Sequence, residues 1–316
     1  MPRRARVDWN AVGAAAPDGL ILVRDLRALG VPSSTIVFRC RKVGGVWWRP
    51  LLGLVALARG VLTVHQRLVA ALLVAGDDAV VTGLAACRLH GLERVPEHDE
   101  VHVLIPHRNR HRSEGFLVAE RTKRMPTSRI LDGIRCAALH RALLDGARRL
   151  SRIDDVRALL CEAVQRHKVT VAALRAEIEA GSCRGAALVR IVIAELEDGI
   201  LSAAEAWLRE LVLGMDDFPA VRWNVELERP DGSPLATVDG LVDGVPLVIE
   251  LHSFAHHADL ETYDATMRRH GELAAAGYLV VPLTPKEVRD DPAGVRRKLR
   301  AALEELRARQ VSPSAA

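Results

Sequence analysis

The chain has 316 residues, a formal net charge of +4 and 49% hydrophobic residues. This hydrophobic content excludes a disordered chain, and the length predicts two or three domains, because one domain usually spans ~100–200 residues. No apolar run reaches the roughly 18 residues of a membrane span, and no signal peptide follows the basic N-terminus. The five cysteines are widely spaced without a CxxC pair, which argues against disulfides and a zinc ribbon. We therefore expect a cytoplasmic protein without a membrane partner.

Charge is distributed unevenly along the chain. Residues 1–125 contain 19 Lys and Arg against 11 Asp and Glu, whereas residues 200–316 contain 13 against 19. This asymmetry predicts different roles for the two ends, with the basic end suited to nucleic acid. Only five of the 44 basic residues are Lys, so the Arg excess also fits a codon bias and does not by itself identify a nucleic-acid-binding protein.

Residues 1–60 predict a winged helix-turn-helix domain. A helix is expected over 23–29, Gly30-Val31-Pro32 breaks it, and a second helix is expected from Ser33 or Ser34 to about Val43. Two short strands over 46–50 and 52–57 would form the wing.

In the second helix of this domain, Ile36, Val37, Cys40 and Val43 can face the core. The outward side chains that we predict to contact DNA are Ser34, Thr35, Arg39, Arg41 and Lys42. The alternative is a small helical domain whose basic face is solvated or mediates protein contacts.

The middle of the chain carries no diagnostic chemistry. Residues 61–125 predict a small α/β extension with helices over 62–75 and 82–90. Strands over 99–106 and 115–121 are expected to pair as a hairpin with a basic loop, 107–112, at its tip. Residues 126–199 predict a helical linker domain, with successive helices over 129–180 and another over 186–197. Its amphipathic helices suit a spacer or a homodimer surface.

Residues 200–310 predict a separate α/β domain, followed by a tail over 311–316. The expected elements are a helix over 203–213, strands over 221–228, 237–242 and 245–251, a helix over 260–276, a strand over 278–283 and a helix over 292–309. The strand over 278–283 is apolar on both faces, which predicts a central place in the sheet.

Carboxylates at set positions of this domain predict a cation site. Glu205 lies on the first helix, Asp239 early in the second strand, and Glu250 at the end of the third strand. Two carboxylates on paired strands bind a hard cation such as Mg²⁺ or Mn²⁺, which positions and activates water against a phosphodiester. We predict Asp239 and Glu250 as metal ligands, and Glu205, Asp239, Glu250 and His252 as catalytic residues.

The N-terminal part resembles the N-terminal region of AbiEi-family antitoxins over roughly residues 10–125. The matching segments are Gly19–Leu26, Gly30–Pro32, Arg39, Gly44–Trp47, Leu54, Ala85–Leu92 and Val101–Val103. This resemblance implies a winged-helix module that binds double-stranded DNA and represses the promoter of its own toxin–antitoxin operon. It also implies a cognate toxin as partner.

The C-terminal part resembles the PD-(D/E)xK nuclease superfamily, in the branch of very-short-patch-repair endonucleases, over roughly residues 199–308. The matching segments are Gly199–Glu205, Val238-Asp239, Val248–His257 and Leu273–Tyr278. The resemblance implies a restriction-endonuclease-like domain that cleaves DNA with a divalent metal. Together the two resemblances imply an α+β multidomain chain with a winged helix-turn-helix, a helical middle and a nuclease-like end.

The nuclease-like segment departs from this pattern at three positions. His252 stands where relatives usually have Asp and the wider superfamily has Lys, while Thr266 and His270 stand where the following helix usually has Asp. Imidazole suits Zn²⁺, Mn²⁺ or general-base work better than Mg²⁺.

Three readings of this segment therefore stay open. One is a metal-dependent DNA endonuclease with an altered site. The alternative is an AbiEi-type antitoxin and repressor whose nuclease-derived domain is inactive. A zinc site that adds His256 and His257 to Asp239, Glu250 and His252 is a third interpretation.

Overall fold

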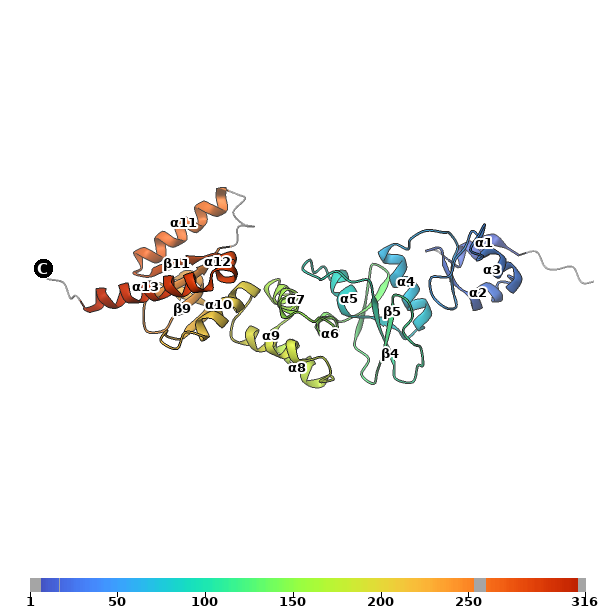
Figure 1. The fold of residues 1–316 in the computed structure, drawn as a ribbon. Coiled ribbons are helices and arrows are strands. Elements are labelled where there is room, and N and C mark those ends of the chain that lie inside the picture. Colours follow the sequence, from blue (N-terminus) through green and yellow to red (C-terminus); the bar gives the residue numbers. More distant parts are fainter. Residues whose placement is uncertain (1–6, 17, 253–259, 312–316) are drawn as a thin grey trace, which may run out of the picture. The chain divides into compact units, whose positions relative to one another are not determined.

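The computed structural model describes residues 7–16, 18–252 and 260–311 (Figure 1). It is a mixed α+β protein that divides into two compact units. Unit 1 comprises residues 1–155 and 168–189, and unit 2 comprises residues 156–167 and 190–316. The chain therefore passes between the units three times, and residues 126–199 contribute to both units. Among the described residues, no helix is both long enough and apolar enough to cross a membrane.

Unit 1 begins with three short helices and a two-stranded sheet. These elements are α1 (Trp9–Ala14), β1 (Leu20–Leu22), α2 (Val23–Ala28), α3 (Ser33–Arg39) and β2 (Leu54–Ala56). β1 pairs antiparallel with β2, and Trp48 forms an isolated bridge to Ala56. Leu26, Ile36, Trp47 and Val55 pack between the helices and the strands.

Helix α3 ends earlier than the sequence pattern predicts. The chain reverses at Gly44, whose φ of +67° favours glycine, and the Trp47 N–H donates to the Arg39 carbonyl at 2.9 Å. A Cβ at Gly45 would lie 2.3 Å from the Arg41 carbonyl oxygen, so this reversal requires glycine there.

The structure corrects two parts of the helix prediction. Arg41 and Lys42 lie beyond the helix. Val37 and Val43 do not enter the core, because their side chains are 62% and 86% exposed.

The remainder of unit 1 is built on a five-stranded sheet with the order β5-β4-β3-β7-β6. Its elements are α4 (Val64–Ala75), β3 (Val80–Val81), α5 (Gly83–Leu89), β4 (Val101–Pro106), β5 (Leu117–Thr122), β6 (Ser128–Leu131) and β7 (Ile134–Ala137). Helices α6 (Leu139–Ala147) and α8 (Val171–Ala180) complete the unit. Leu104, Ile105 and Leu143 are fully buried in it.

Strands β4 and β5 are parallel, so the predicted hairpin is wrong. A six-residue strand is ~20 Å long, and ten extended residues span up to ~33 Å. Residues 107–116 are therefore long enough to carry the chain back to the start of β4. A tight turn at Gly115 (φ +54°), closed by mutual backbone hydrogen bonds between Glu114 and Leu117, then starts β5.

The first residues of the predicted helical middle form a β-hairpin instead. Strands β6 and β7 pair antiparallel around Asp132 and Gly133, whose φ values are +48° and +77°. Two positive φ angles are typical of a type I′ turn, for which Asp-Gly is a preferred sequence. The helical prediction for 129–137 is therefore wrong, whereas α7 (Ile153–Gln165), α8 and α9 (Ala187–Glu197) follow as predicted.

Unit 2 is a four-stranded sheet with helices on both faces. Its elements beyond α7 and α9 are α10 (Ala203–Leu213), β8 (Val221–Glu228), β9 (Pro234–Val242), β10 (Leu247–Leu251), α11 (Leu260–Ala275), β11 (Leu279–Leu283), α12 (Pro285–Asp290) and α13 (Pro292–Val311). One face packs Ile249 and Leu247 against α10 and α13, and the other packs Val238 and Val248 against Leu273 of α11.

The sheet order in unit 2 is β11-β10-β9-β8, so β11 is an edge strand and its predicted central place is wrong. The strand is apolar on both faces because α11 and α13 contact it. Helix α11 is also the crossover that makes β10 and β11 parallel. The crossover brings α11 over the end of β10, where Glu250 lies.

Candidate functional site

The carboxylates of Asp239 and Glu250 come together in the middle of the unit 2 sheet. Strands β9 and β10 are antiparallel, with Ile249 paired to Gly240, and this register continues to set Glu250 opposite Asp239. The Leu251 N–H donates to Asp239 Oδ2 at 2.6 Å. Burial raises the pKa of Glu250 to about 7, and the nearby Asp239 charge adds to the effect. Burial also raises the pKa of Asp239.

Glu205 has a capping role in addition to its place near Asp239. Ser202 Oγ accepts from the Glu205 N–H at 3.1 Å, and Glu205 Oε2 accepts from the Leu201 N–H at 2.9 Å. Asn224, which has a φ of +50°, donates its side-chain amide to the same oxygen at 2.6 Å. Burial raises the pKa of Glu205, and the Asp239 charge raises it further. The carboxylate therefore fixes the start of α10 beside the acidic pair.

Helix α11 adds a cation and an imidazole to the acidic pair. Arg269 Nη2 donates to Glu250 Oε2 at 2.5 Å. His270, the next residue, faces His252 with their ring centroids 5.0 Å apart. Glu250, His252 and His270 each offer one ligand atom, and these atoms lie within 4.8 Å of one another. Two of the three positions at which the sequence departs from the nuclease pattern thus meet Glu250.

The other members of the predicted site do not add ligand atoms to this group. Asp239 is not in the three-residue cluster. Thr266 lies on α11 and is half-buried. His256 and His257, considered above as zinc ligands, lie outside the described residues. The described ligand atoms are therefore those of Glu250, His252 and His270.

The predicted DNA contacts in unit 1 lie on and after α3. Ser34 and Lys42 are exposed, and Thr35 is half-buried. The Arg39 guanidinium stacks on the rings of Trp9 and Trp47, at 4.2 and 4.9 Å from their centroids.

Arg41 makes a similar contact beyond the end of the helix, because its guanidinium lies 4.1 Å from the ring centroid of Phe38. Cation–π contacts hold both guanidinium groups in place but do not neutralise their charge. The surface of α3 therefore keeps its positive charge.

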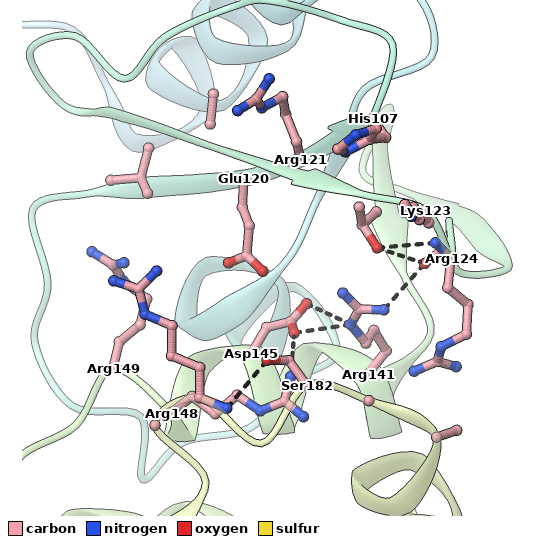
Figure 2. Close-up of a pocket in the computed structure, with 17 residues that line it drawn as sticks. His107, Glu120, Arg121, Lys123, Arg124, Arg141, Asp145, Arg148, Arg149 and Ser182 are labelled. Carbon is pink, nitrogen blue, oxygen red and sulfur yellow. Dashed lines mark hydrogen bonds and ion pairs between the residues drawn. The ribbon is translucent and has the colours of Figure 1, made fainter.

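A basic cavity of about 870 Å³ lies between β5 and the α6 and α8 region of unit 1 (Figure 2). Two of its lining residues are acidic, Glu120 and Asp145, and both have basic partners. The cationic lining residues are Arg121, Lys123, Arg124, Arg141, Arg148, Arg149 and Arg184.

Some of these cations are neutralised and others are not. Arg124 pairs with Glu177, and Arg149 Nη2 lies 2.5 Å from Glu100 Oε2. Within the described residues, the side chains of Arg121, Lys123 and Arg184 have no hydrogen-bond or ion-pair partner. The cavity therefore presents unneutralised positive charge on a concave surface.

A second concavity continues this surface along the 107–112 loop. It shares His107 and Arg121 with the first, and it adds Arg108, Arg110 and Arg112. It has no acidic lining residue, although Arg108 pairs with Asp78 at 2.7 Å. We call the two concavities together the basic groove.

A buried polar network forms the floor of the basic groove. Asp145 accepts hydrogen bonds from Thr82 Oγ1 at 2.8 Å and from Arg141 Nε at 2.8 Å. Figure 2 shows Asp145 next to Arg141, below Arg121 and Lys123. This network fixes α6 against the sheet and supports the groove from below.

In comparisons with known proteins, the chain matches no family model, no curated sequence and no solved structure. The arrangement of its own residues therefore carries the functional argument.

Sequence reasoning missed the basic groove and part of the acidic site. The loop 107–112 is visibly basic, but Arg141 lies in a helix that reads as amphipathic, and Arg148 and Arg149 directly follow that helix. Only the i,i+4 spacing of Arg141 and Asp145 hinted at a buried pair. His270 was visible as a departure from the nuclease pattern but not as a neighbour of His252.

Proposed function

We propose that the protein binds double-stranded DNA and that unit 2 hydrolyses phosphodiester bonds with a divalent metal ion. The observation that carries the hydrolytic part is that Asp239 and Glu250 meet on the central strands of unit 2, where Arg269 of α11 contacts Glu250. Paired carboxylates beside a cation are suited to hold a metal and an anionic substrate in one place.

The residues present fit a divalent metal ion. Glu250 is 1% exposed, and within the described residues its Oε1 atom has no hydrogen-bond partner. Asp239 and Glu250 would hold Mg²⁺ or Mn²⁺, which would supply an activated water to attack phosphorus. Arg269 would orient the scissile phosphate beside the metal.

DNA affinity is assigned to unit 1. Its basic groove has unpaired Arg121, Lys123 and Arg184, and the segment after α3 adds Arg41 and Lys42. The order α1-β1-α2-α3-β2, with β1 paired to β2, supports a winged helix-turn-helix for residues 1–60. Unit 2 is acidic overall, so it approaches DNA only where cations offset the repulsion.

A plasmid-nicking assay tests the hydrolytic proposal. The full chain is expected to relax supercoiled plasmid with Mg²⁺ or Mn²⁺, and EDTA is expected to stop the reaction. Asp239→Asn together with Glu250→Gln should abolish it, whereas Glu228→Gln, an exposed acid on β8, should not. Cleavage that survives the double substitution would reject the assignment.

The salt dependence of binding to a short duplex tests the DNA-binding proposal. Each lost phosphate contact lowers the slope of log K against log salt by about 1. Arg110→Ala with Arg112→Ala and Arg121→Ala is expected to lower the slope by about 2–3. The matched control carries Lys286→Ala, Arg297→Ala and Arg307→Ala, three exposed cations of unit 2. Equal effects of the two triple variants would count against the groove.

A repressor and antitoxin without catalytic activity is the second candidate function. The Arg269–Glu250 ion pair favours it, because Arg269 already neutralises the carboxylate that a metal would need. This function requires sequence-specific binding to the promoter of its own operon and binding to a cognate toxin. Footprinting of that promoter, together with a plasmid that stays supercoiled in every metal, would favour the repressor over the nuclease.

A further inference from the structure

Three side chains from two adjoining segments converge on one point beside the unit 2 sheet. Glu250 lies on β10, His252 directly follows this strand, and His270 lies on α11. One ligand atom from each lies within 4.8 Å of the other two. The two imidazole rings are tilted by 55° with centroids 5.0 Å apart, which is not a stacked pair. The rings thus converge without forming a face-to-face contact.

Two polar atoms of these side chains are buried without a protein partner. Within the described residues, neither Glu250 Oε1 nor His270 Nε2 has a hydrogen bond, and both atoms are inaccessible to solvent. Buried polar atoms in native proteins nearly always have a partner. Arg269 occupies Glu250 Oε2, so Oε1 is the oxygen that remains for a ligand. An ion bound to Oε1 and Nε2 would satisfy both atoms.

The donor set discriminates between classes of metal ion. Mg²⁺ prefers oxygen ligands, whereas imidazole nitrogen suits Zn²⁺, Co²⁺ and other transition-metal ions. Two imidazoles and one carboxylate leave a coordination position open, as in catalytic zinc sites. Asp239, the residue that would favour a hard ion, lies outside the cluster, and its Oδ2 is held by the Leu251 N–H.

We propose that Glu250, His252 and His270 bind one transition-metal ion of the Zn²⁺ and Co²⁺ class in preference to Mg²⁺. The proposal rests on the same site as the proposed function and names the ion that this site selects. It does not depend on DNA cleavage, because metal binding is measured directly.

Cobalt absorption tests the proposal with the full chain. Every variant carries Cys183→Ser, because Cys183 is an exposed thiol that would itself bind Co²⁺. After chelator treatment, titration with Co²⁺ is expected to produce visible absorption bands that saturate at one ion per chain. Equimolar Zn²⁺ should displace the bound Co²⁺, and a hundredfold excess of Mg²⁺ should not. Absence of saturable Co²⁺ binding, or displacement by Mg²⁺, would overturn the proposal.

Substitutions then localise the ion. His270→Ala is expected to weaken Co²⁺ binding at least about tenfold, since the loss of groups around metal ligands alone costs 10–100-fold. His65→Ala, an exposed imidazole on α4 in unit 1, is the matched control and should bind Co²⁺ as before. Circular dichroism of each variant verifies folding. Unchanged Co²⁺ binding by a folded His270→Ala variant would overturn the assignment.

A second variant, designed to shift the metal selectivity of the site towards Mg²⁺, tests the proposal if His270→Ala does not fold. His270→Asp replaces the imidazole with a carboxylate, so Mg²⁺ should compete with Co²⁺ at least about tenfold better than before. Unchanged Mg²⁺ competition would contradict the proposal. Plasmid nicking is followed with the same samples. Cobalt binding without nicking in any metal rejects the proposed function alone, and nicking with Mg²⁺ without cobalt binding rejects this inference alone.

Discussion

The buried ion pair of Arg157 and Glu195 gives the sharpest test of how unit 2 is stabilised. Arg157 Nε and Nη2 lie 2.9 and 2.6 Å from the two carboxylate oxygens of Glu195, and the two side chains are only 2% and 9% exposed. Arg157→Met leaves the Glu195 carboxylate buried without its partner. Breaking such a pair on one side costs about 3–5 kcal/mol, a large share of the roughly 5–15 kcal/mol that stabilises a domain.

Removing the charge of Glu195 instead should cost less stability, because Arg157 also pairs with Glu210, whose side chain reaches solvent. For Glu195→Gln we expect about 1–3 kcal/mol, the cost of a weakened buried hydrogen bond. The double variant Arg157→Met with Glu195→Leu removes both charges and should return to within about 1 kcal/mol of the wild type. Arg222→Ala, which breaks an exposed pair with Asp243, is the control and should cost at most about 1 kcal/mol.

Hydrogen exchange of the full chain measures these changes as opening free energies of peptides from α7 and α9. Peptides from α4 serve as an internal reference, because that helix belongs to unit 1 and the pair belongs to unit 2. A change below about 1 kcal/mol for Arg157→Met would refute the reasoning. A double variant as destabilised as the single one would also refute it, since the cost would then come from lost packing and not from the unpaired charge.

Three further predictions concern unit 1. Gly146→Ala should destabilise unit 1, because the added Cβ would lie 2.9 Å from Leu84 Cδ2. The overpacking costs about 1–3 kcal/mol, which outweighs the ~1 kcal/mol gain in helix propensity. Urea unfolding measures the net change in the free energy of unfolding. A thiol reagent should label the exposed Cys183 before the buried cysteines, and Cys183→Ser should remove the fast phase seen by mass spectrometry. His102 lies 3.0 Å from Glu120 and holds the pKa of that carboxyl below its usual 4.5. The Glu120 carboxylate therefore stabilises the fold above pH 4.5, and this stabilisation is lost as the pH falls through the pKa of Glu120 in the folded state. In Glu120→Gln the melting temperature should fall less over this acidic pH range.

The sequence predicted those elements whose periodicity is local. Helices α4, α5 and α10 and strands β8 to β10 lie where the apolar spacing and turn residues set them. The meeting of Asp239 with Glu250 also followed from the sequence, because two strands joined by the Asp243-Gly244 turn must pair with a register that the turn length fixes.

Pairing between distant segments was not predictable from local patterns. The apolar alternation of β4 and β5 is the same in a hairpin and in a parallel pair, and only the tertiary fold decides between them. Apolar residues on both faces of β11 predict a central strand because they indicate burial, but α11 and α13 supply that burial at the sheet edge. His270 meets His252 only because α11 crosses over β10, which no spacing rule reveals.

Asp132 and Gly133 show a different kind of miss. Their Asp-Gly turn is a strong hairpin signal, whereas the amphipathic pattern begins only after the second strand, at α6. The early end of α3 has a similar cause, because Gly44 and Gly45 belong to a reversal that starts four residues earlier, and they do not mark the end of the helix. Turn residues in both places carried more information than the apolar spacing.

The three passages of the chain between the units determine how the protein can be dissected. Neither unit is a continuous stretch, because residues 168–189 of unit 1 follow residues 156–167 of unit 2. A truncation after residue 155 removes α8, and with it Glu177, whose carboxylate pairs with Arg124. A single cut therefore leaves each fragment with a missing or surplus piece. To obtain unit 1 alone, a gene must join residues 7–155 directly to residues 168–189.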